Sequence, residues 1–256
     1  MSRPFMYDDE AMKRRLVKGD VGEALFRRWF DKNVGHLENI RLVHWGYYPL
    51  GVVKDEEKRK LLKQQSDPDY ALVRGNAPNK PLRGISVNSQ SRPYDIRSTM
   101  GGDCIKCPRS TSCYDGNEQD LWYNEFNIRS DYTKFSQQNG VEVALASLIV
   151  GSLNTVAQRV SEGGLEQVVH DYVQGGEEAV DDKDGLAAFL KQLEKRERVK
   201  NFRWLLHSEV RDGKVSSFIT GGWSNRGRPR LVYCVDMKLS RDQKSFVQSV
   251  RGLDVR

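Results

Sequence analysis

The sequence lacks a long apolar run, a signal peptide, an internal repeat and a low-complexity tract. Its longest apolar stretch, residues 141–150, is about as long as a strand and contains Glu142, whereas a membrane-spanning helix needs about 20 apolar residues. The first ten residues have no apolar core of the kind that a signal peptide requires. We therefore expect a soluble, cytoplasmic protein without a membrane partner.

The composition is that of a globular protein with a basic balance. Hydrophobic residues make up 38% and charged residues 30% of 256 positions, and this length fits one elaborated domain or a core with an appendage. The net charge of +6 favours a polyanionic partner, because lysines and arginines that contact phosphates release counterions. Both signs are mixed along the chain, so charge alone does not identify the partner.

Hydrophobic periodicity predicts a mixture of helices and strands, and therefore an α/β or α+β fold. A helix is expected over residues 18–33, where apolar residues recur at helical spacing. The apolar run 141–150 predicts a strand buried on both faces. Further strands are expected at 40–48, 70–73, 84–88 and 121–128, further helices at 131–138, 165–173 and 185–198, and a final antiparallel group of strands at 202–210, 215–221 and 230–239.

These elements suggest a lead-in at residues 1–17, a core over 18–153, and C-terminal helices and strands over 154–256 that pack on the core. Residues 76–120 are rich in glycine, proline, serine, asparagine and aspartate, which indicates an insertion into the core. The insertion has little apolar core of its own, so we expect a bound metal to stabilise it.

Three acidic residues stand out by their context. Glu23 interrupts the apolar surface of the first helix, and Asp69 opens a strand directly after a proline. Glu125 lies within a run of strand-forming residues. Carboxylates on adjacent strands, with a third from a nearby helix, suit Mg²⁺ or Mn²⁺, which take oxygen ligands and activate water. Each residue alone also has an ordinary explanation, as a helix-surface, turn or exposed strand residue.

The order of these motifs resembles the PD-(D/E)XK nuclease superfamily: a helix with Glu23, a strand with Pro68-Asp69, a strand with Glu125, a short helix and an apolar strand. The resemblance covers roughly the first 150 residues apart from the insertion. It implies a restriction-endonuclease-like fold, a mixed central sheet flanked by helices. It also implies metal-dependent hydrolysis of DNA, with Asp69 and Glu125 binding Mg²⁺ or Mn²⁺ and Glu23 completing the site.

One position departs from the superfamily's pattern. The lysine two residues after the glutamate is Asn127 here, which can donate a hydrogen bond but carries no charge. Arg129 or Lys134 could replace the lysine as the group that positions water or phosphate. A second assignment places the third strand at residues 84–90; we rank it lower because that run contains no carboxylate.

Three of the four cysteines, Cys104, Cys107 and Cys113, fall within ten residues with the spacing C-x2-C-x5-C. In a chain without a secretory signal, this spacing favours a metal site over disulfides. Cys234 is the expected fourth ligand. The competitors are the four histidines, His36, His44, His170 and His207. The spacing resembles the iron–sulfur staple of certain exonucleases in the superfamily, so a structural [4Fe-4S] cluster is preferred over Zn²⁺.

A basic segment near the C-terminus suggests contacts to DNA. Arg226, Arg228 and Arg230 are candidate phosphate contacts, and Trp223 could stack on a base of a single strand. The leading hypothesis is therefore a Mg²⁺- or Mn²⁺-dependent deoxyribonuclease. The alternative is a catalytically inactive nucleic-acid-binding protein, or a scaffold subunit of a replication, repair or packaging assembly. The missing lysine favours this alternative.

Overall fold

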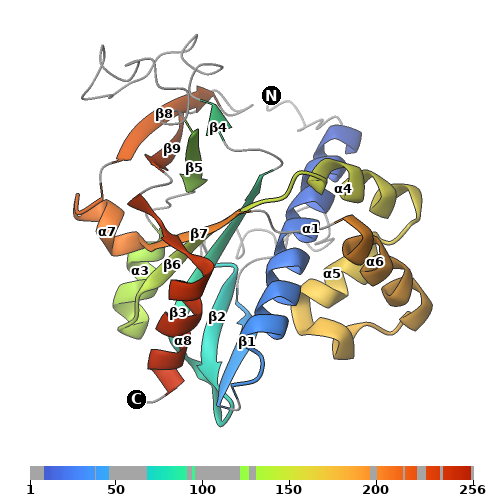
Figure 1. Ribbon diagram of the computed structural model, residues 1–256, viewed down its shortest axis with the longest axis horizontal. Helices are drawn as coiled ribbons and strands as arrows, with labels where there is room; N and C mark the ends of the chain where they lie inside the picture. The colour runs from blue at the N-terminus through green and yellow to red at the C-terminus, as the bar shows by residue number, and fades with distance from the viewer. Residues whose placement is uncertain are drawn as a thin grey trace, which may run out of the picture.

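The computed structural model shows a mixed α/β protein with a six-stranded sheet flanked by helices and a separate four-stranded sheet (Figure 1). It describes residues 9–37, 39–45, 68–90, 94–95, 122–126, 131–196, 201–215, 217–223, 229–236 and 239–254. For the four-stranded sheet it describes the backbone only. Among these residues, no helix has both the length and the apolar character needed to cross a bilayer.

The six-stranded sheet has the order β1-β2-β3-β6-β7-β10. Neighbouring strands are antiparallel except for β3 and β6, which run parallel. Helix α3 (Asp131–Asn139) precedes β6 in the connection between the two parallel strands, as such a pair requires a long crossover. The strands are β1 (Ile40–His44), β2 (Tyr70–Arg74), β3 (Ala77–Gln90), β6 (Val143–Ile149), β7 (Asn201–Leu206) and β10 (Arg241–Asp242).

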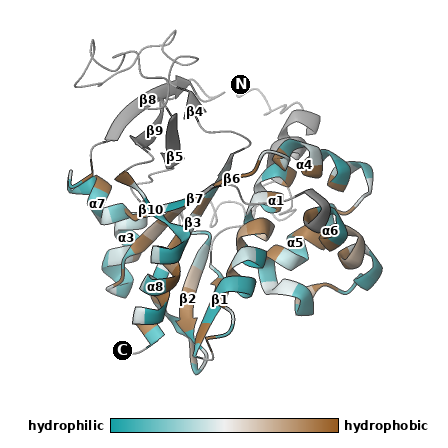
Figure 2. Ribbon diagram, in the orientation of Figure 1, coloured by the Kyte–Doolittle hydropathy of each residue, from teal (hydrophilic) through white to brown (hydrophobic). Residues whose placement is uncertain are grey.

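Helices cover both faces of this sheet and enclose two apolar cores. The larger core lies beneath α1, α4, α5, α6 and α8, and the smaller one lies beneath α3 and α7. Figure 2 shows hydrophobic residues on the strands and on the helix faces turned towards them. The helices are α1 (Asp9–Asn33), α4 (Leu153–Glu162), α5 (Glu166–Gly175), α6 (Lys183–Arg196), α7 (His207–Arg211) and α8 (Gln243–Asp254), with a 3-10 helix η3 (Gly176–Ala179) after α5.

Strand β6 confirms the prediction of a strand buried on both faces. All seven of its residues are buried. Ala144 and Leu148 point into the larger core, whereas Val143 and Leu145 point into the smaller one, because successive side chains of a strand alternate between its faces. The predicted helices at 131–138, 165–173 and 185–198 are also confirmed, within three residues at their ends, as α3, α5 and α6.

The predicted final group of antiparallel strands is wrong as a single unit. Strand β7 joins the six-stranded sheet beside β6, and residues 207–211 form α7. Phe202 and Trp204 of β7 are buried in the larger core, which explains why this strand pairs there. The second sheet has the order β4-β5-β9-β8. Its strands are β4 (Tyr94–Asp95), β5 (Trp122–Phe126), β8 (Ser217–Trp223) and β9 (Pro229–Asp236).

Two expected boundaries also move. Helix α1 begins at Asp9 and therefore includes much of the expected lead-in. The expected insertion, residues 76–120, opens with β3, a 14-residue strand between β2 and β6. Periodicity missed the first half of β3 because its register with β2 shifts twice, at Leu72/Val73 and Val73/Arg74, and such irregularities break a simple alternation.

Helix α1 approaches β3 closely at Gly22. A Cβ atom added to Gly22 would lie 2.4 Å from Oγ and 2.5 Å from Cβ of Ser89. A Cβ atom added to Gly19, one turn earlier on α1, would meet no heavy atom within 4 Å. Glycine at position 22 therefore allows helix and strand to come within a distance that any side chain would prevent.

We expect Gly22→Ala to lower the free energy of unfolding by about 1–3 kcal/mol, because the added methyl group overlaps Cβ of Ser89, which cannot move without the β3 backbone. Gly19→Ala is the matched control on the same helix. It should raise the free energy of unfolding by roughly 0.5–1 kcal/mol, because alanine favours the helix. Urea unfolding followed by circular dichroism measures both. Equal effects would contradict the close approach.

Candidate functional site

Asp69 lies immediately before β2, and its carboxylate is bound by the neighbouring strand. Its Oδ2 accepts a hydrogen bond from the backbone N–H of Val87 at 2.6 Å and one from Oγ of Ser86 at 3.2 Å. Both donors belong to β3, which pairs with β2 in antiparallel register. Two donors on one oxygen fix the orientation of the carboxylate and stabilise its charged form.

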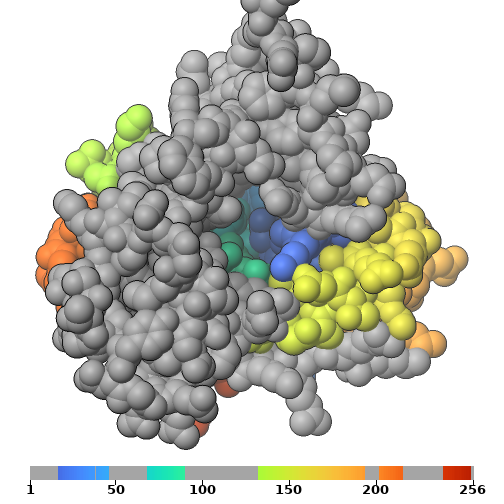
Figure 3. Space-filling model, turned by 90° about the horizontal axis from the view of Figure 1, so that it is seen from above, coloured from blue at the N-terminus to red at the C-terminus, as the bar shows by residue number. Residues whose placement is uncertain are grey.

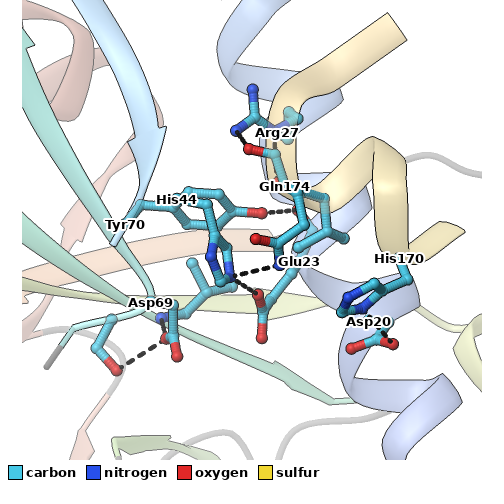
Figure 4. Close-up of polar contacts among 11 residues, drawn as sticks. Asp20, Glu23, Arg27, His44, Asp69, Tyr70, His170 and Gln174 are labelled. Atoms are coloured by element: carbon cyan, nitrogen blue, oxygen red, sulfur yellow. Dashed lines mark hydrogen bonds and ion pairs between the residues drawn. The ribbon is translucent and has the colours of Figure 1, made fainter. Parts of the chain in front are cut away.

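Glu23 approaches Asp69 from α1 (Figure 4). The hydroxyl of Tyr70 donates to the backbone carbonyl of Glu23 at 3.3 Å, and the ring of Tyr70 packs 5.7 Å from that of Phe26. Because Tyr70 directly follows Asp69, these contacts fix the helix relative to the start of β2. In the view from above, atoms of α1 (blue) and of residues 68–90 (teal) are visible beside α4 (yellow) (Figure 3).

The electrostatic setting of Glu23 is unfavourable to its charge. Only 21% of its side chain is exposed. Burial, followed by the negative charges of Asp69 and Asp20, raises the pKa of the Glu23 carboxyl well above its usual range, and Arg27 only partly opposes this. The carboxylates of Glu23 and Asp69 repel each other in this partly buried place, and a bound cation would offset that repulsion.

His44, at the end of β1, is beside Glu23. Its Nε2 lies 3.6 Å from Oε2 of Glu23 and 3.4 Å from Nε2 of Gln174 on α5. Burial, followed by the positive charges of Arg27 and His170, lowers the pKa of His44 to about 4. The imidazole is therefore neutral at neutral pH, so the Glu23 contact is not an ion pair under those conditions.

Arg27 connects the site to α5. It is 5% exposed, its Nε donates to the carbonyl of Val173 at 3.0 Å, and its Nη2 donates to the carbonyl of Gln174 at 3.3 Å. Its guanidinium also lies 5.4 Å from the centre of the Tyr70 ring. One turn before Glu23, Oδ2 of Asp20 lies 3.8 Å from Nδ1 of His170 (Figure 4). Polar contacts of Arg27 and Asp20 therefore link α1 to α5.

No protein-family model, curated protein or solved structure matches the chain. The residues and their geometry are therefore the basis for any functional conclusion.

The structure brings together two of the three acidic residues singled out in the sequence, Glu23 and Asp69. The backbone of Glu125 lies on β5 in the four-stranded sheet, where it pairs with Cys234 of β9. The strands that flank β2 are β1 and β3. The neighbour of the Asp69 strand is thus the run 84–90, the assignment that the sequence ranked lower for want of a carboxylate.

The remaining candidates are distributed as follows. Asn127, Arg129 and the cysteines Cys104, Cys107 and Cys113 lie outside the described residues, so the expected iron–sulfur or zinc site stays a prediction. Lys134 is exposed on α3. Strands β8 and β9 are paired as far as Trp223 of β8 and Pro229 of β9. The backbones of Trp223 and Arg230 therefore lie at the end of this strand pair. Arg226 and Arg228, between them, lie outside the described residues.

Sequence reasoning missed the residues that hold Asp69 in place. A signal was present, since apolar and polar residues alternate in the run 84–90. This alternation places Ser86 and Asn88 on the opposite face from Ile85 and Val87. What the sequence could not supply was the pairing of that run with the strand that follows Asp69, because pairing depends on contacts between distant segments.

A divalent cation would fit the donor set with help from solvent. Within the described ranges, no three His, Cys, Asp or Glu side chains form a group that could hold a metal ion. Mg²⁺ in enzymes is commonly bound through one or two carboxylates, with water and substrate phosphate completing the shell. Glu23 and Asp69 would serve as those two carboxylates, and a bound cation would oppose the effects of burial and of the negative charges of Asp69 and Asp20, which raise the pKa of Glu23.

The raised pKa of Glu23 predicts a pH-dependent cost to stability. The folded protein holds this proton more tightly than the unfolded chain does, so the free energy of unfolding should fall as pH rises from about 4.5 through the raised pKa. Glu23→Gln cannot ionise and should escape this loss. In EDTA, its advantage over the wild type should grow as the pH rises through this range.

Urea unfolding between mildly acidic and alkaline pH measures this difference. Glu178→Gln, on the exposed 3-10 helix η3, is the control and should show a constant difference from the wild type. An advantage of Glu23→Gln that does not change with pH would mean that Glu23 carries no unfavourable charge in the folded protein.

Proposed function

We propose that the protein is a metal-dependent nuclease that hydrolyses phosphodiester bonds of DNA, with Glu23 and Asp69 binding Mg²⁺ or Mn²⁺. The observation that carries the proposal is the meeting of these two carboxylates, one from α1 and one from the start of β2, in a partly buried place where burial and the charge of Asp69 disfavour the charged form of Glu23. Such perturbed pairs are characteristic of functional sites.

The arrangement of elements supports the same proposal. Helix α1, the antiparallel strands β1, β2 and β3, helix α3 and strand β6 occur in this order along the chain, with β4 and β5 of the second sheet between β3 and α3. This order agrees with the PD-(D/E)XK resemblance if β3 takes the place of the strand with Glu125. We therefore propose a restriction-endonuclease-like fold, with β3 as the third strand of the motif. In this assignment Ser86, which donates to Asp69, and Asn88, two residues further along β3, stand where the superfamily has a carboxylate and a lysine.

Glu125 stays in the proposal as a third carboxylate supplied by the second sheet. Its strand, β5, contacts β6, and β6 is the other neighbour of β3. We propose that Glu125, with Asn127 and Arg129, completes the site. Cleavage by Glu125→Gln tests its part in the site separately from Glu23 and Asp69.

The residues of the chain prepare the site for a phosphodiester. A bound Mg²⁺ or Mn²⁺ would lower the pKa of a coordinated water and offset charge on the phosphate. Ser86 and the N–H of Val87 hold the Asp69 carboxylate. His44, neutral at neutral pH, lies beside Glu23 and adds no positive charge that would compete with a cation.

The alternative function is DNA binding without cleavage. It is favoured by β3, which has the uncharged Ser86 in contact with Asp69 and the uncharged Asn88 two residues further on. Two residues after Ser86, where the superfamily has its lysine, β3 has Asn88, and an amide carries no charge that would offset charge on a reacting phosphate. A scaffold subunit of a replication, repair or packaging assembly would show the same behaviour, and its DNA or protein partner would bind without being cut.

Cleavage assays separate the two functions. The wild type should cut DNA in Mg²⁺ or Mn²⁺ and not in EDTA. Asp69→Asn should lose at least about a hundredfold in rate, because it removes a charged ligand while keeping the size of the side chain. Asp181→Asn, on the exposed surface between η3 and α6, is the control and should cut normally.

Single- and double-stranded DNA and RNA of matched sequence should be tested side by side. Retention of DNA by the wild type without cleavage in either metal would establish the alternative. Undiminished cleavage by Asp69→Asn would show that the activity resides elsewhere in the protein.

A further inference from the structure

Two buried hydroxyl groups lie in the smaller core, directly behind Asp69. Tyr132 of α3 is 2% exposed and Ser86 of β3 is 7% exposed, and Oη of Tyr132 lies 2.5 Å from Oγ of Ser86. Their surroundings are largely apolar, since Phe135, Leu145 and Leu205 belong to the same core. Burying two hydroxyl groups among apolar side chains is costly unless they are hydrogen-bonded.

Tyr132, Ser86 and Asp69 form a chain of hydrogen bonds, and the chemistry of their polar groups sets its direction. A carboxylate can only accept, so the single proton of Ser86 is directed to Oδ2 of Asp69. The Ser86 oxygen is then the acceptor in its contact with Tyr132, and Tyr132 is the donor. The chain runs from Tyr132 through Ser86 to Asp69, and each donor strengthens the next.

The chain also fixes geometry across three elements. Tyr132 lies in the first turn of α3, Ser86 on β3, and Asp69 before β2. Tyr132 is itself held, because its ring packs edge-on against His207 at 5.7 Å. The same Oδ2 receives the N–H of Val87. With two donors on one oxygen, the plane of the Asp69 carboxylate is set by the core of the protein.

We propose that Tyr132 is a positioning residue for Asp69, which acts through Ser86 to hold the carboxylate in the orientation that binds a divalent cation. The inference rests on the proposed function of the Glu23–Asp69 site. It also explains why β3 carries Ser86 where a carboxylate would be expected: the hydroxyl donates to Asp69, whereas a carboxylate would repel it. Partners of this kind around metal ligands typically change metal affinity or activity by about 10- to 100-fold.

Tyr132→Phe is the decisive variant, because it removes the hydroxyl and keeps the ring. We measure Mn²⁺ binding without DNA by electron paramagnetic resonance, and DNA cleavage across a range of Mn²⁺ concentrations. The variant should need about 10- to 100-fold more Mn²⁺ for half-maximal binding and half-maximal cleavage. The rate at saturating Mn²⁺ should fall much less, since the ligands themselves remain. A merely structural role would not separate the two effects.

Three further variants test the route through Ser86. Ser86→Ala should weaken Mn²⁺ binding at least as much as Tyr132→Phe. The double variant should be no weaker than Ser86→Ala, because both changes break one chain. Ser86→Thr keeps a hydroxyl and should recover most of the affinity. Tyr172→Phe is the control, since Tyr172 is a buried tyrosine of the other core, and it should bind Mn²⁺ as the wild type does.

The outcomes distinguish the two proposals. If the wild type binds Mn²⁺ and cuts DNA but Tyr132→Phe does so at the same Mn²⁺ concentrations, the positioning role is overturned and the nuclease function stands. If the wild type binds no Mn²⁺, both proposals fall. Circular dichroism and the thermal midpoint of each variant confirm that it folds. If Tyr132→Phe unfolds, the comparison of Ser86→Ala with Ser86→Thr decides the question.

Discussion

The structure depends on the contact that presses α1 against the sheet at the start of β2. Gly22 lets the helix approach Ser89, and one turn further Phe26 and Trp29 pack on aromatic rings of the strands and of α8, with Trp29 stacked 4.4 Å from Phe202. Apolar contact of this extent is strongly stabilising. It supplies the free energy that keeps Glu23 beside Asp69 despite their repulsion, so the packing of the core and the strain of the site are linked.

Much of the fold follows from the sequence because the pattern is local. The 3.6-residue period of α5 and α6 and the apolar run of β6 reflect faces that must be buried wherever those segments pack. The strand pairing does not follow in this way. Residues 202–206 look equally suited to either sheet, and only the fit of Phe202 and Trp204 into the larger core places β7 beside β6.

The candidate site was predictable in part for the same reason. Glu23 and Asp69 could be found because each is an acidic residue set in an apolar context, which is visible along the chain. Their partners could not, since Ser86, Tyr132 and His44 are ordinary polar residues in sequence. They become informative only when β3 pairs with β2 and α3 packs behind it. The run that contains Ser86 has no carboxylate, so the sequence alone favours the strand with Glu125 as the third strand.

The placement of Arg27 gives the α-helical layer an influence on the acidic pair. The same guanidinium holds the last carbonyls of α5 and moderates the charge of Glu23. Gln174, at the same end of α5, reaches His44. The C-terminal turn of α5 therefore fixes two groups around Glu23 at once, the guanidinium of Arg27 and, through His44, the amide of Gln174.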